Sequence, residues 1–102
     1  EIRAEAGQGD INQNTQYIDV SVYPNPVHDV FYVRFNKLPK KVNAATVNIL
    51  SIDGQVVHSF QAGVQSYQVL DIEYVQQLTP AVYLLSIELS NSQKIIQKFI
   101  KQ

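Results

Sequence analysis

Short segments in which apolar and polar side chains alternate recur along most of this chain. The clearest one lies at 83–90, where apolar residues occupy every odd position from Tyr83 to Leu89 while Ser86 and Glu88 stand between them. A period of two is the spacing of a β-strand, because successive side chains of a strand point to opposite faces of the sheet. The pattern therefore predicts a β-protein whose strands each bury one face.

Turn-forming residues separate these segments at intervals of roughly 8–12 residues, which is typical of sandwiches. We expect strands at 18–23, 30–35, 45–52, 56–60, 67–72, 83–90 and 93–101. Seven such strands predict an all-β, antiparallel β-sandwich. Its core is expected to contain alternate apolar residues of these strands, namely Val20, Val22, Phe31, Val33, Val47, Ile49, Leu70, Ile72, Tyr83, Leu85 and Ile87.

Two turn motifs stand out. Residues Tyr23, Pro24, Asn25 and Pro26 end the first strand, because proline cannot donate to a strand ladder. Asparagine followed by proline suits the first two positions of a type I turn, which we expect over 25–28. Asp53-Gly54 lies between apolar runs and predicts a hairpin with a type I′ turn, whose two central residues have positive φ.

The remaining connections are weaker in pattern. Residues 91–92, Asn-Ser, predict a tight turn, and residues 73–77 are compatible with a single helical turn. In the last predicted strand, 93–101, apolar residues occur at both odd and even positions. We therefore expect the second face of that strand to be partly covered.

The bulk composition limits the possible functions. With 102 residues the chain has room for one domain, which buries about two-thirds of its unfolded surface on folding. A hydrophobic content of 45% argues against disorder, and a net charge of -1 gives no reason to expect nucleic acid as partner. There is no cysteine, and no apolar run approaches the ~18 residues of a membrane span, so no direct membrane insertion is expected.

The N-terminal stretch differs from the rest of the chain. Residues 1–16 are rich in Gly, Asn and Gln, and Ile2 and Ile11 are their only large aliphatics. Such a composition buries too little apolar surface to order itself. We expect 1–16 to be a flexible linker inside a longer protein, and the domain to cover 17–102.

No constellation of catalytic residues emerges. His28 and His58 are the only histidines, and His58 is expected on the solvent face of its strand. A zinc site needs at least three suitably spaced ligands, which the sequence does not offer. Asp71 and Glu73 fit solvated rim positions better than a catalytic pair. We therefore expect no enzyme activity, no catalytic residue, no metal site and no cofactor.

Basic residues gather near the end of the chain. Residues 91–102 contain Lys94, Lys98 and Lys101 but no acidic side chain. Lysines of this kind protect a sheet edge from pairing with another chain. They also suit an electrostatic patch for an acidic receptor. Both interpretations stay open at this level.

Taken in order, these motifs resemble a known family. The proline pair at 23–26, the hairpin around Gly54, the pair Leu78 and Tyr83, and the basic last strand are similar to the type A C-terminal sorting domains of the type IX (Por) secretion system of Bacteroidetes. The resemblance covers 17–102. Ala81 stands where the family pattern has glycine.

The resemblance implies an immunoglobulin-like sandwich that acts as a secretion signal in its folded form. It would direct an upstream cargo through the periplasm and an outer-membrane translocon, to the cell surface or the medium, with a shuttle protein and a cell-surface sortase as further partners. Cleavage would then fall within 1–16. We expect the recognition surface to involve Lys94, Lys98, Lys101 and the carboxylate of Gln102, and the motif residues Tyr23, Pro24, Asn25, Pro26, Gly54, Leu78 and Tyr83 to be structural.

Two other functions fit the same sandwich. One is an adhesive or carbohydrate-binding module, and the other is a structural spacer or a domain that dimerises by strand exchange.

Overall fold

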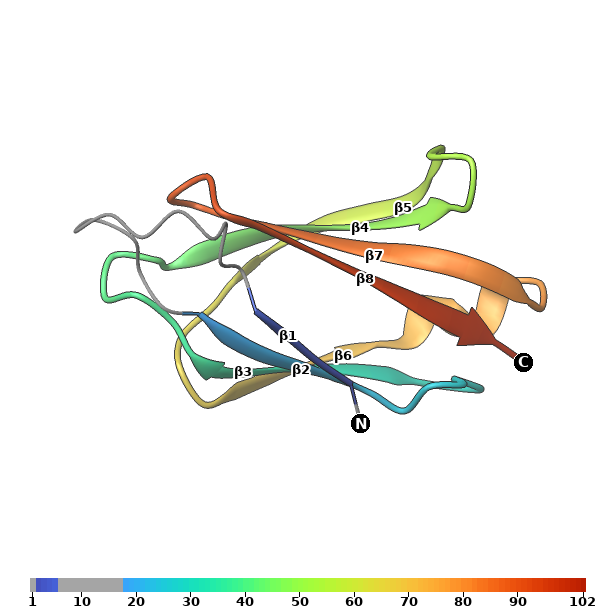
Figure 1. Cartoon of the computed structure of the whole chain (residues 1–102), viewed down its shortest axis with the longest axis horizontal. Coiled ribbons are helices and arrows are strands. Elements are labelled where there is room, and N and C mark those ends of the chain that lie inside the picture. The colour runs from blue at the N-terminus through green and yellow to red at the C-terminus, as the bar shows by residue number, and fades with distance from the viewer. Residues whose placement is uncertain (1, 6–17) are drawn as a thin grey trace.

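Two antiparallel sheets packed face to face make up the computed structural model, which describes residues 2–5 and 18–102 (Figure 1). The elements, in chain order, are β1 (Ile2–Glu5), β2 (Asp19–Tyr23), β3 (Phe31–Lys37), β4 (Ala44–Ser51), β5 (Val56–Gly63), β6 (Gln68–Ile72), the 3₁₀ helix η1 (Glu73–Gln77), β7 (Ala81–Leu89) and β8 (Lys94–Lys101). All seven predicted strands are present as β2 to β8. The predicted all-β sandwich is confirmed.

The chain divides its strands between two four-stranded sheets. Sheet A has the order β1-β2-β3-β6, and sheet B has the order β5-β4-β7-β8. The hairpins β4–β5 and β7–β8 lie side by side in sheet B through the antiparallel pairing of β4 with β7. Sheet B therefore ends in β5 on one edge and in β8 on the other.

The core lies between the sheets and uses the residues that the alternation predicts. Of the predicted core positions all are buried except Leu70, which is partly buried and packs against the others. Phe31 of sheet A meets Phe99 of sheet B with ring centroids 4.5 Å apart. Full burial of one such side chain contributes about 1.5–3 kcal/mol, so these contacts hold the two sheets together.

The N-terminal prediction needs correction for one segment. Residues 2–5 were expected in a linker, but they form β1, which pairs with β2 from Ile2 opposite Val22 to Glu5 opposite Asp19. The edge of β2 offers unpaired backbone groups, and backbone pairing does not require apolar side chains. Residues 1 and 6–17, the rest of that expected linker and the first domain residue, lie outside the described residues.

The hairpin at Asp53-Gly54 is confirmed, but its predicted turn type is wrong. The Gly54 N–H donates to the Ser51 carbonyl at 2.9 Å, and the Ser51 N–H donates to the Gln55 carbonyl at 2.8 Å. Only Gly54 has positive φ, at 93°, whereas Asp53 does not. The connection is a three-residue loop in which a turn is followed by one left-handed residue, not a two-residue type I′ turn.

The second hairpin of sheet B has the same loop. The Ser92 N–H donates to the Leu89 carbonyl at 2.8 Å, and the Leu89 N–H donates to the Gln93 carbonyl at 2.8 Å. The left-handed position is held by Ser92, with φ 74°. The predicted tight turn at 91–92 is therefore present, with a serine where its counterpart has a glycine.

Two predicted side-chain positions are wrong. His58 lies opposite the buried Ile49, so its ring points to the inner side of sheet B, where it stacks on Tyr74 at 3.8 Å and 4°. In β8, Ile96 is 56% exposed and Ile100 is 43% exposed. The second face of β8 is therefore open where partial cover was expected. The helical turn at 73–77 is confirmed as η1.

Candidate recognition surface

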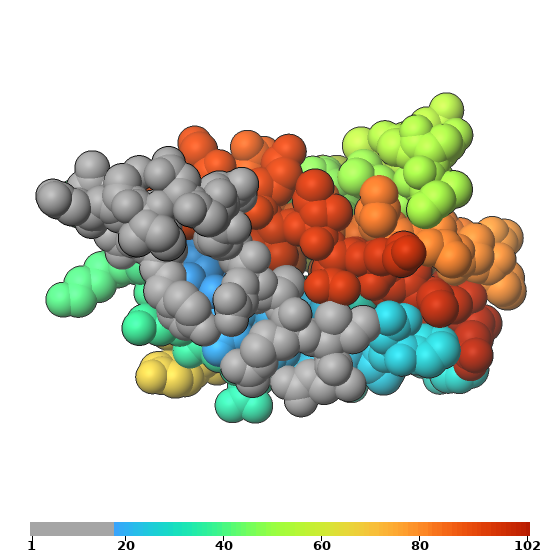
Figure 2. Space-filling view, in the orientation of Figure 1, coloured from blue at the N-terminus to red at the C-terminus, as the bar shows by residue number. Residues whose placement is uncertain are grey.

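The two motifs that begin and end the domain meet at the end of β8. Val27 forms a parallel bridge with Lys101, in which the Val27 N–H donates to the Ile100 carbonyl at 2.8 Å. The Gln102 N–H donates in turn to the Val27 carbonyl at 2.9 Å. Figure 2 shows the red end of β8 lying at the surface beside the cyan residues that follow β2. The type I turn predicted over 25–28 is wrong, because residues 25, 26 and 28 form bends around the Val27 bridge to Lys101.

Asn25 completes this junction. Its side-chain Oδ1 accepts a hydrogen bond from the Ile100 N–H at 2.8 Å, across 75 residues of sequence. The peptide bonds Tyr23-Pro24 and Asn25-Pro26 are both cis. We call the contacts of residues 25–27 with residues 100–102 the clamp. The clamp occupies the outer edge of β8 at its C-terminal end.

Lys101 belongs to the interior and not to the surface. It is 9% exposed, and its Nζ donates to the Leu78 carbonyl at 3.2 Å. Tyr83, beside it, donates from its hydroxyl to the Thr79 carbonyl at 2.7 Å. Both side chains therefore hydrogen-bond to backbone carbonyls of the connection between η1 and β7. The structure thus separates Lys101 from the other lysines of β8.

Ala81 takes the position where the family pattern has glycine, and the backbone there has no need of glycine. It is the first residue of β7 and pairs with Lys101. Ala81 is not among the residues with positive φ, so its Cβ meets no conformational penalty.

Lys94 and Lys98 are exposed on the outer face of sheet B. The backbone N–H and C=O of Ile100 bond to the clamp and so point away from β7. Hydrogen-bonding direction alternates along an antiparallel strand, so Lys94, Ile96 and Lys98 direct the same groups to the outer edge. This stretch of β8 combines an edge and two cations, with β1 of sheet A beside it.

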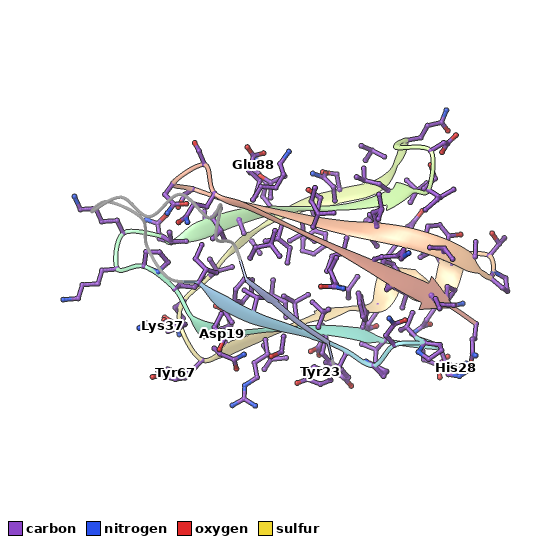
Figure 3. The ribbon with its side chains drawn as sticks, in the orientation of Figure 1. Asp19, Tyr23, His28, Lys37, Tyr67 and Glu88 are labelled. Carbon is purple, nitrogen blue, oxygen red and sulfur yellow. The ribbon has the colours of Figure 1, made fainter. Side chains whose placement is uncertain are left out.

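Other kinds of site find little support in residues 2–5 and 18–102. No three side chains of the His, Cys, Asp or Glu type cluster as metal ligands would. Figure 3 shows His28 at one end of the sandwich, and His58 belongs to β5. No helix in this part of the chain has the length and apolar character needed to cross a membrane.

A comparison with protein families identifies the family of this domain. The model of the secretion system C-terminal sorting domain matches residues 21–102. The chain belongs to this family. Searches of curated proteins and of solved structures gave no match. The domain is therefore a sorting signal of the Por (type IX) secretion system, from a non-catalytic family that directs secretion across the outer membrane.

The match includes both ends of the clamp, the Gly54 hairpin and the Leu78–Tyr83 connection, so the resemblance inferred from these motifs is confirmed at the level of the family. It begins at Ser21 within β2, so β1 lies outside it. The recognition roles of Lys94, Lys98 and Gln102 remain predictions. Sequence reasoning missed the pairing of Val27 with β8, for which an isolated valine after two prolines gives no signal.

Proposed function

We propose that this sorting domain is recognised in its folded form, through β8, by the type IX machinery that exports an upstream cargo. The observation that carries the proposal is the clamp. The family match spans the two motifs, and those motifs hold the end of β8 in one position through three hydrogen bonds. A strand that is fixed at its end presents a preorganised edge, which lowers the entropy lost on binding.

Recognition then proceeds by strand addition. An extended receptor segment pairs with the outer edge of β8 between Lys94 and Lys98, where the backbone groups point away from β7. Carboxylates of the receptor complement the two ammonium groups. Gln102 is the last residue of the clamp, through its N–H bond to the Val27 carbonyl. Lys101 has no part in this surface because it is buried.

Later steps follow from the same function. The domain carries its cargo through the periplasm to an outer-membrane translocon with the help of a shuttle protein. A cell-surface sortase then cuts within 1–16, and the cargo is released or anchored at the cell surface. This sequence of events leaves no role for a cofactor.

The test uses the whole chain fused behind a folded reporter that carries an N-terminal secretory signal. In a bacterium with a type IX system, the reporter should appear outside the outer membrane. Deleting 100–102, which removes the β8 side of the clamp and leaves the buried Phe99 in place, should retain it in the periplasm. Normal export of the deletion variant would contradict recognition through β8.

A charge test examines the two lysines, with the melting temperature of each variant measured beside export, because a glutamate at position 94 would lie opposite Glu88. Exchanging Lys94 and Lys98 for glutamate should reduce export by about tenfold, because like charges then face an acidic receptor. The matched control exchanges Lys40 and Lys41, two exposed loop lysines, for glutamate and should export normally. Equal export of the two double variants would show that the lysines of β8 only protect an edge.

A further inference from the structure

A row of aliphatic side chains crosses the outer face of sheet B. Val56 lies opposite Leu50, Leu50 lies opposite Leu84, and Leu84 lies opposite Lys98. Residues that lie directly opposite each other share one face of a sheet. The register therefore places one continuous row across all four strands, aliphatic in β5, β4 and β7 and ending on the ammonium group of β8.

A second group extends this row toward the clamp. Val82 and Ile100 form a cross-strand pair on the same face and are 36% and 43% exposed. Ile96 stands on the other side of Lys98 and is 56% exposed, and Val56 is 59% exposed. Leu50 and Leu84, in the two central strands, are half-buried. We call the set Leu50, Val56, Val82, Leu84, Ile96 and Ile100 the aliphatic face.

The aliphatic face is confined to one end of the sheet. The next row toward the other end joins Asn48 to Ser86 and ends on Ile96, so Ile96 borders the polar part of the sheet. The row after it carries Thr46, Glu88 and Lys94, and Figure 3 shows Glu88 pointing away from the core. On β2, β3 and β6 of sheet A, Val69 is the one exposed aliphatic side chain. A contiguous exposed apolar surface on a small soluble domain marks an interaction site, whereas single exposed aliphatics need no explanation.

The charges beside the aliphatic face limit the kind of partner. Lys98 lies between Ile96 and Ile100 of the aliphatic face, and Lys94 lies on the far side of Ile96, at the start of β8. Glu88, the acidic side chain of this face among the described strands, lies opposite Lys94 at the polar end. The partner must therefore offer aliphatic groups bordered by carboxylates.

We propose that the aliphatic face of sheet B binds a protein surface of that chemistry, on a component of the machinery that recognises the folded domain. This inference rests on the proposed function and adds to it a second contact surface, at right angles to the edge of β8. Strand addition supplies affinity through the backbone with little dependence on sequence, and the aliphatic face supplies the side-chain contacts that select the partner.

A second copy of the chain fits this face less well. A twofold pair that stacks β8 of one copy on β5 of the other would set Lys98 against Val56, Ser59 and Gln61, the outward residues of β5. None of these is a carboxylate. An anionic lipid surface is also disfavoured, because the chain carries a net charge of -1 and this face offers only two lysines.

The experiment exchanges exposed aliphatics for threonine, which keeps β-branching and strand propensity but removes apolar surface. The triple variant Val82→Thr, Ile96→Thr, Ile100→Thr is compared with the control Val69→Thr, at a 42% exposed position in sheet A. Both are exported as full-chain reporter fusions, and both are melted as purified chains. We expect the triple variant to lose about tenfold in export at an unchanged melting temperature, and the control to lose nothing.

If the triple variant melts lower, Ile96→Thr alone replaces it, and a loss of export with that variant supports the proposal. Export equal to wild type overturns it while leaving the sorting function intact. Failure of the wild-type chain to export the reporter overturns both. A dimer in sedimentation that the triple variant abolishes, or flotation with phosphatidylglycerol vesicles that it abolishes, assigns the face to another occupant and overturns the proposal.

Discussion

At the scale of single residues, one left-handed backbone position occurs in each hairpin of sheet B. Gly54 and Ser92 hold the same place in loops with the same hydrogen bonds. A non-glycine residue in this conformation loses roughly 1–2 kcal/mol, because its Cβ crowds the following carbonyl. A glycine avoids that loss. However, its greater conformational freedom in the unfolded chain lowers the stability of the folded state by about 0.4–1 kcal/mol.

Ser92→Gly should therefore stabilise the domain by about 0.5–1 kcal/mol. Gly54→Ala should destabilise it by about 1 kcal/mol through φ alone, since a Cβ at position 54 would meet no atom within 4 Å. Denaturant unfolding of the two variants measures both effects. A loss of stability in Ser92→Gly would mean that the serine makes a contribution that its backbone conformation does not explain.

Asn25 is the other residue whose role is local. Asn25→Ala removes the acceptor of the Ile100 N–H and should cost about 0.5–1.5 kcal/mol in unfolding free energy. Amide hydrogen exchange at Ile100 should become faster, while exchange at Phe99, which faces β7, should be unaffected by the lost contact. Asn25→Asp keeps an acceptor oxygen and serves as the control. Unchanged exchange at Ile100 would show that the clamp does not depend on this side chain.

At the scale of elements, β8 carries lysines of two kinds. Lys94 and Lys98 are exposed, whereas Lys101 is buried and bonded to Leu78. Lys101→Met should change the stability by no more than about 1 kcal/mol, because the lost hydrogen bond and the avoided burial of an ammonium group oppose each other. Export should also stay normal. A strong loss of export at wild-type stability would return Lys101 to the recognition surface, while Lys40→Met, at an exposed loop position, controls for the loss of one charge.

At the scale of the whole molecule, the sandwich does not need β1, which is an edge strand of sheet A. Residues 18–102 contain three strands of sheet A, all of sheet B and a core of buried apolar residues drawn from both sheets. A chain that begins at residue 18 should therefore keep its β-rich circular dichroism spectrum. It should self-associate more than the full chain, because the edge of β2 becomes free to pair. Light scattering checks this, and a truncated chain without cooperative unfolding would show that the domain begins earlier.

Much of the fold could be predicted because it depends on local pattern. The period-two alternation of Tyr83 to Leu89 decides which side chains face the core, since a strand has only two faces. Alternation and the turn residues between the segments together predicted the positions of β2 to β8. The turn at Asp53-Gly54 was located but not described correctly, because a hairpin with one left-handed residue and a hairpin with two begin from the same dipeptide.

Alternation does not predict which strands are neighbours, or where a chain segment leaves one sheet to contact the other. The inward position of His58 depends on its register with Ile49, and the burial of Lys101 depends on a carbonyl 23 residues away. The sequence by itself determined the strands β2 to β8, most of their buried faces and the family. The tertiary structure alone decided that Asn25 and Val27 hold the end of β8, and that six aliphatic residues from four strands form one surface, because such contacts arise only when distant segments pack side by side.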